Sequence, residues 1–138
     1  MDGDNKKGEY MPETEKITIN MNVVDLGKID LLVARGFYAS RTDFIRAAIR
    51  DLLNGHTEEI KNDAEYKTAA VGVAAELRSE LEKLQKIGAQ KDIFVIGMLW
   101  IQDDVSPELA RATIRSLRVY GVFRAPEAVK AALADRMR

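Results

Sequence analysis

The sequence predicts an α+β fold that is mostly helical, with a short N-terminal strand and a small C-terminal α+β module. Residues 16–22 (KITINMN) alternate strictly between polar and apolar side chains, as a strand does. Two helical patterns follow over residues 22–35 and 40–54, and no second strand lies near them. Because backbone N–H and C=O groups need partners, we expect the strand to pair antiparallel with the same strand of a second copy.

The two faces of the predicted strand differ in chemistry. One face carries Ile17, Ile19 and Met21, and the other carries Lys16, Thr18, Asn20 and Asn22. Pairing between copies would bury the apolar face against helices and leave the polar face outward. A polar two-stranded ribbon of this kind fits the major groove of DNA.

Both predicted helices carry start and stop signals. Asn22 is suited to cap the first helix, and Gly36 stands where a glycine ends one. The second helix begins at Ser40, with Asp43 completing a capping box, and Asn54-Gly55 provides its stop. The sequence therefore predicts two helices joined by a short turn between residues 22 and 55.

Residues 57–88 are predicted to form one long linker or oligomerisation helix. Apolar residues at steps of four and three support it: Ala70, Ala74, Leu77, Leu81 and Leu84. This spacing suits a short coiled coil and an amphipathic helix on a core equally well, and we leave both open.

The C-terminal segment, residues 89–138, changes character. The β-type run 92–101 and the weaker one at 117–123 are each followed by a helix start, at Ser106-Pro107-Glu108 and Ala125-Pro126-Glu127. The two halves form a weak β-α repeat. We expect a small α+β module for oligomerisation or sensing, whose two strands pair with another copy or pack on the long helix. Residues 1–15, which are polar, are predicted to be a mobile arm.

Composition excludes several classes of site. The 138 residues include no cysteine, so disulfides, zinc knuckles and cysteine nucleophiles are excluded, and a cytoplasmic location is expected. The longest apolar run, residues 93–101, is too short to span a membrane, and the N-terminus has no secretory apolar region. No catalytic dyad or phosphate-binding glycine loop is visible, so we expect no enzymatic activity.

The charge balance is nearly even along the chain. Residues 1–56 contain 8 Lys and Arg against 9 Asp and Glu (net −1), and residues 93–138 contain 7 against 5 (net +2). A protein held on DNA mainly by phosphate charge would be basic. Any positive surface must therefore be local, and produced by folding and dimer symmetry.

Residues 16–53 resemble the ribbon-helix-helix fold of the Arc/MetJ/CopG class of bacterial transcription regulators. The resemblance rests on the strand KITINMN, on the segment ARGFYASRTDFIRAAIRDLL and on the spacing between them. It covers 38 residues, a little over a quarter of the chain.

The resemblance implies two sets of DNA contacts. Strand residues on the polar face would read bases: Lys16, Thr18 and Asn20. Residues at the start of the second helix would hold a backbone phosphate: Ser40, Arg41 and Thr42. The side-chain chemistry agrees, since Asn pairs with adenine, Lys reaches guanine, and a helix N-terminus suits an anion. The family often has arginine where this chain has Lys16.

No metal or cofactor is expected. Some members of the resembling family sense nickel with histidines and a cysteine, whereas this chain has only His56 and no cysteine. Asp103-Asp104 is interpreted as an ordinary acidic turn before a helix. Trp100, Tyr120 and Phe123 are interpreted as core or subunit-interface residues rather than a ligand pocket.

The leading hypothesis is a homodimeric transcription regulator, a repressor that binds a short palindromic operator in double-stranded DNA and associates further through its C-terminal module. The alternative is an antitoxin that uses the same fold to control its own synthesis. A third possibility is an assembly protein whose ribbon only dimerises. The operator, the regulated genes and any effector are not specified by the sequence.

Overall fold

The computed structural model describes residues 13–138, which form two compact units. The first unit comprises residues 16–67. The second comprises residues 68–138 together with residues 13–15. Most of the arm predicted at 1–15 lies outside the described residues, so that prediction is not tested there.

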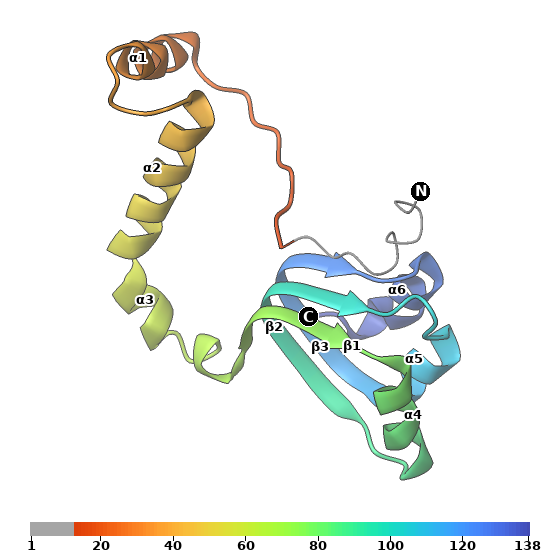
Figure 1. Ribbon diagram of the computed structural model, residues 1–138. Helices are drawn as coiled ribbons and strands as arrows, with labels where there is room; N and C mark the ends of the chain where they lie inside the picture. Colours follow the sequence, from red (N-terminus) through yellow and green to blue (C-terminus); the bar gives the residue numbers. More distant parts are fainter. Residues whose placement is uncertain (1–12) are drawn as a thin grey trace. The chain divides into compact units, whose positions relative to one another are not determined.

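The first unit consists of helices α1 (Val23–Ala34), α2 (Arg41–Gly55) and α3 (Thr57–Asn62) (Figure 1). The two predicted helices are confirmed. At the end of α1, Gly36 has φ of +83°, and the N–H of Phe37 donates to the carbonyl of Leu32 at 3.0 Å. This is a glycine-dependent helix ending. Residues 16–22 belong to no strand within the protomer, and their pairing with a second copy stays a prediction.

The prediction of one long helix over residues 57–88 is wrong. Helix α3 ends at Asn62, a 3-10 turn (η2, Tyr66–Thr68) follows, and Ala70–Glu76 forms strand β1 before helix α4 (Arg78–Lys86) begins. The alanine spacing resembled a helical stripe, but β1 pairs along its whole length with the strand β2 (Lys91–Ile101). Pairing with a distant segment outweighs the helix preference of alanine, and Gly72 would weaken a helix there.

The second unit is built from three consecutive β-α repeats. Strands β1, β2 and β3 (Ile114–Arg124) are followed by α4, α5 (Pro107–Thr113) and α6 (Glu127–Leu133), and a last 3-10 turn (η3) covers Ala134–Arg136. The sheet order is β1-β2-β3 and both pairings are parallel. The helices lie together on one side of the sheet (Figure 1). The two-stranded sheet expected from the sequence is therefore three-stranded, because the first strand comes from the segment interpreted as a helix.

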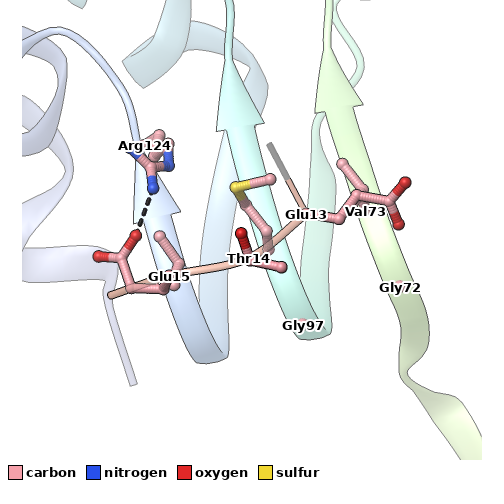
Figure 2. A pocket seen from close by; sticks show the side chains of 9 residues that line it. Glu13, Thr14, Glu15, Gly72, Val73, Gly97 and Arg124 are labelled. Carbon is pink, nitrogen blue, oxygen red and sulfur yellow. Dashed lines mark hydrogen bonds and ion pairs between the residues drawn. The ribbon is translucent and has the colours of Figure 1, made fainter. Parts of the chain in front are cut away.

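The face of the sheet opposite the helices carries residues 13–15. These residues, which we name the strap, run across the strands, with Thr14 near Gly97 and Glu15 beside Arg124 (Figure 2). The carboxylate of Glu15 accepts a hydrogen bond from the guanidinium of Arg124. Strap and sheet together line a hollow of about 190 Å³. The strap leads directly into residues 16–22.

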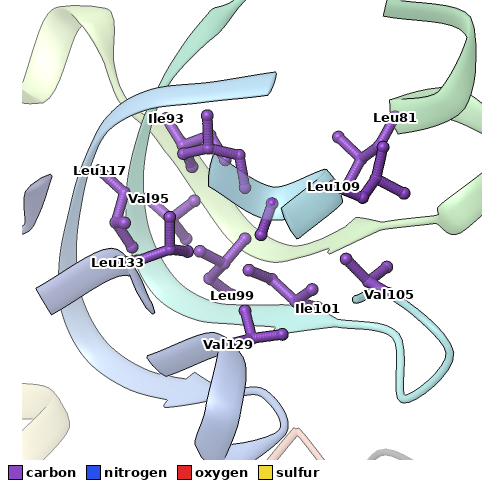
Figure 3. Close-up of a cluster of buried hydrophobic side chains, with 12 residues drawn as sticks. Leu81, Ile93, Val95, Leu99, Ile101, Val105, Leu109, Leu117, Val129 and Leu133 are labelled. Carbon is purple, nitrogen blue, oxygen red and sulfur yellow. The ribbon is translucent and has the colours of Figure 1, made fainter. Parts of the chain in front are cut away.

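The core lies between the sheet and its helices (Figure 3). Val95, Leu99 and Ile101 project from the same face of β2 and are at most 1% exposed, as strand alternation requires. They pack against residues of β3 and the helices: Leu81, Leu109, Ile114, Leu117, Val129 and Leu133. The face of the sheet that meets the helices is therefore well packed.

Candidate nucleic-acid interface

Residues 16–20 are exposed along their whole length in the protomer. The polar residues Lys16, Thr18 and Asn20 are available to solvent, as a base-reading surface requires. Ile17 and Ile19 are also exposed, at 74% and 64%. Apolar side chains at this exposure are unfavourable in water, so this segment is incomplete without something to cover it.

Asn22, the last residue of segment 16–22, caps the start of α1. The side-chain oxygen of Asn22 accepts hydrogen bonds from the backbone N–H groups of Val24 at 2.8 Å and Asp25 at 3.3 Å. Asn22, predicted from the sequence as the helix cap, therefore fixes where the strand-forming segment ends and the helix begins.

The start of α2 is a reciprocal capping arrangement. The hydroxyl oxygen of Ser40 accepts a hydrogen bond from the N–H of Asp43, and the carboxylate of Asp43 accepts one from the N–H of Ala39, both at 3.0 Å. The Ser40 cap agrees with the capping box predicted from the sequence, whereas the Asp43 carboxylate accepts from Ala39, one residue before the cap, and not from Ser40 itself. The first N–H groups of a helix have no acceptor within it, and those of Arg41 and Thr42 are in this position. They form a partial positive charge that suits an anion.

An ion pair joins the end of α1 to the start of α2. The guanidinium of Arg41 donates to both carboxylate oxygens of Asp30, from Nε at 2.7 Å and from Nη2 at 2.8 Å. These hydrogen bonds lower the pKa of Asp30 and raise the pKa of Arg41. Sequence reasoning missed this pair, because the two residues lie eleven positions apart on different predicted helices and Asp30 carried no motif signal.

The structure brings Ser40, Arg41 and Thr42 together at one exposed helix start, as their adjacency in the sequence requires. The paired guanidinium of Arg41 changes the chemistry expected of it. Two-point binding to Asp30 fixes the direction of the guanidinium and places a carboxylate beside its charge. The backbone N–H groups and the hydroxyls of Ser40 and Thr42 therefore remain as the donors for an incoming anion.

The other candidate residues have ordinary surroundings. The imidazole Nδ1 of His56 lies 3.7 Å from the carboxylate of Glu59, and both side chains are exposed. Among the described residues, no group of three potential metal ligands occurs. Of the aromatic residues in the second unit, Phe123 packs on the core, whereas Tyr120 is 54% exposed.

No helix in the described part of the chain is both long and apolar enough to cross a membrane.

Residues 12–130 match the Ribbon-Helix-Helix transcriptional regulator family. No curated protein and no solved structure gives a significant match. Because the matched region covers most of the 138 residues, the chain belongs to this family of transcriptional regulators. The match extends well beyond residues 16–53, so the three β-α repeats lie largely within the family's own boundaries.

Proposed function

We propose that the chain is a dimeric, sequence-specific DNA-binding repressor, in which residues 16–22 of two copies pair as a ribbon and enter the major groove. The family supports DNA binding and dimerisation in general. The repressor role, the residues that read bases and the cytoplasmic site of action are part of the proposal.

The observation that carries the proposal is the incomplete burial of the first unit. Among residues 16–67, Ile29 alone is buried, although the unit contains two amphipathic helices. Large apolar side chains remain exposed on every helix and on residues 16–22: Ile17, Ile19, Val23, Val24, Leu31, Phe37, Ile49, Leu52, Leu53 and Ile60. A unit that buries so little apolar surface is not stable alone, which is typical of domains that fold as obligate dimers. A second copy supplies both the missing core and the missing strand partner.

Dimerisation decides which side chains face DNA. When Ile17 and Ile19 turn toward the shared core, strand alternation turns Thr18 and Asn20 outward. Asn binds adenine with two hydrogen bonds, and Thr contacts thymine through its methyl group. Lys16, at the start of the ribbon, reaches guanine or a phosphate.

The start of α2 supplies the phosphate contact. In this proposal the N–H groups of Arg41 and Thr42, with the hydroxyls of Ser40 and Thr42, hold one backbone phosphate on each side of the ribbon. Arg41 acts chiefly by holding α1 and α2 together through Asp30. Phosphate contacts fix the register of the ribbon, and the ribbon reads the sequence.

The compact second unit favours a regulator over an antitoxin. An antitoxin tail that folds only on its toxin would have few internal contacts, whereas residues 68–138 enclose a core of fully buried side chains such as Leu99 and Leu133. Protease treatment of the isolated protein distinguishes the two: a resistant fragment from about residue 68 onward supports the regulator, and its rapid loss supports the antitoxin.

The direct test uses the Asn20→Ala variant and a selected operator, obtained by enriching bound sequences from a random DNA pool at fixed salt. We expect Asn20→Ala to weaken operator binding by about 1–3 kcal/mol and to relax the preference at one base position in each half-site. The matched control is Asn54→Ala, which changes the same residue type at the far end of α2. Mobility shifts showing equal affinity and equal base preference for Asn20→Ala and the wild type would refute the assignment.

Salt dependence separates the regulator from a protein whose ribbon only dimerises. A DNA-binding ribbon gives an affinity that falls steeply with salt concentration, because phosphate contacts release counterions. An assembly protein shows no such binding at any salt concentration.

A further inference from the structure

The three-stranded sheet has two open edges in the described part of the chain. β1 and β3 flank β2 in this sheet, and within the described residues no named strand pairs with the outer backbone of residues 70–76 or 119–124. Proteins usually protect a free edge with charged residues or proline. The first six residues of β1, AVGVAA, contain neither, and Val71 and Val73 are 61% and 45% exposed.

Each strand repeats the same pattern at the same height in the sheet. The row Val71–Ile96–Tyr120 is followed by the row Gly72–Gly97–Gly121 and then by Val73–Met98–Val122. A fourth strand could therefore join at either edge in the same register. The strands of a second copy have this pattern. Its β3 could join the free edge of β1, and its β1 could join the free edge of β3.

The glycine row gives this repetition a direction. A Cβ atom on Gly97 would lie 2.1 Å from the carbonyl oxygen of Gly72, and one on Gly121 would lie 2.0 Å from that of Gly97. In β2 and β3, the glycine carbonyl of the preceding strand thus lies where a side chain on the glycine would be. Gly72 has a similar backbone conformation, with φ of +124°, and faces open space. The carbonyl that fits beside Gly72 is that of a Gly121 from outside the protomer.

The C-terminal residues cover β3 only where a copy of β1 would not reach. Met137 pairs with Leu117, and the N–H of Arg138 donates to the carbonyl of Leu117 at 3.0 Å. In the register of the sheet, the first residue of β1, Ala70, aligns with Val95 and Val119. Met137 therefore lies beside Leu117, whereas Ala70 of another copy would lie beside Val119.

We propose that the β3 edge of one copy pairs in parallel with the β1 edge of a second copy, with Gly121 opposite Gly72. This contact goes beyond the ribbon and does not depend on DNA binding. Tyr120 then lies beside Val71 and Val122 beside Val73, which covers the apolar side chains that the protomer leaves exposed. Because the two edges differ, the contact is head-to-tail: two copies can close it on each other, and further copies can extend it.

Cross-linking in the full-length chain tests this contact on a background without cysteine. Val71→Cys and Tyr120→Cys chains are refolded separately and as a mixture, then treated with a short bis-maleimide. Side chains facing each other on adjacent strands are about 5 Å apart, so the mixture should give a covalent dimer and each single variant alone should not. A product from either single variant alone, which indicates antiparallel like-edge pairing, overturns the proposal, and so does the absence of product in the mixture.

The Val71→Cys/Tyr120→Cys double variant extends the test. A covalent dimer as the largest product indicates closure between two copies, and a ladder of larger products indicates extension; both support the contact. The control is Val71→Cys/Glu127→Cys, because the Glu127 side chain is 92% exposed on α6 and belongs to no strand. Cross-linking of this control as efficient as that of the double variant indicates random collision and overturns the proposal.

A charge placed on the edge gives an independent check. Adding Val73→Lys to the double variant should lower the cross-linked fraction about tenfold or more, because Val122 of the second copy would cover this position and remove water from the ammonium. The matched control adds Ile87→Lys, which changes an equally apolar side chain that is 75% exposed outside the sheet. Equal cross-linking of the two lysine variants overturns the proposal. Mobility shifts on the same proteins report separately on the ribbon.

Discussion

Ser40 combines two roles that substitution can separate, a helix cap and a proposed phosphate contact. Its hydroxyl oxygen accepts the N–H of Asp43 at 3.0 Å. Ser40→Ala removes this acceptor and is expected to lower the free energy of unfolding by about 0.5–2 kcal/mol. Asn and Asp both cap helices as well as Ser, so Ser40→Asn and Ser40→Asp should leave the stability within a few tenths of a kcal/mol of the wild type.

The Asn and Asp variants should then differ sharply on DNA. They have the same shape, but Asp places a negative charge where the proposal places a phosphate. Two unit charges about 4 Å apart repel by roughly 4 kcal/mol at an effective dielectric constant of 20, and salt reduces this. With two such sites in a dimer, we expect Ser40→Asp to bind operator DNA at least about a hundredfold more weakly than Ser40→Asn.

Urea unfolding and mobility shifts on the three variants measure the two roles. Equal DNA affinity of Ser40→Asp and Ser40→Asn, at equal stability, would refute the phosphate site and leave Ser40 as a cap alone. Loss of stability in Ser40→Asn would instead refute the capping argument. The pair is informative because neither result depends on the other.

Two further predictions concern the packing and charge of the fold. Gly97→Ala should destabilise the second unit severely, because its Cβ would lie 2.1 Å from a neighbouring carbonyl oxygen, whereas Gly27→Ala in α1 meets open space and should stabilise by about 1 kcal/mol; thermal unfolding compares them. Hydrogen bonds from Arg115 lower the pKa of Asp92 to about 2 from 3.8, so its contribution to stability is present above pH 4 and declines as pH falls toward 2. Asp92→Asn should remove this contribution, so the free energy of unfolding in urea should fall less between pH 5 and pH 2.5 in the variant than in the wild type. An equal fall in both proteins would contradict the prediction.

Local signals in the sequence were enough for the first unit. The capping residues Asn22, Ser40 and Asp43 and the ending at Gly36 act on their immediate neighbours, so their positions alone specify where each helix begins and ends. A strand at residues 16–22 was predicted from alternation, but these residues belong to no strand within the protomer, and their pairing with a second copy stays a prediction.

The second unit could not be predicted in the same way, because its first strand depends on contacts with residues about 25 positions away. Alanine-rich β1 favours a helix by propensity, and only its pairing with β2 makes it a strand. The glycines could have given a signal: Gly72, Gly97 and Gly121 recur with an apolar residue on each side. Recognition of this spacing would have shown three repeats where the sequence suggested two.

Two different self-association surfaces on one chain have a consequence for operator binding. The proposed ribbon would join two copies through residues 16–22, and the proposed edge contact would join copies through β1 and β3. If both operate between different pairs of copies, one bound ribbon holds a second ribbon nearby, and the second half-site binds at a raised effective concentration without any new base contact. Val73→Lys would then leave binding to a single operator unchanged and weaken binding to two operators in tandem. If the edge contact instead forms between the two copies of one ribbon dimer, Val73→Lys should affect binding to the single and the tandem operators equally. The comparison therefore identifies which copies the sheet edge joins.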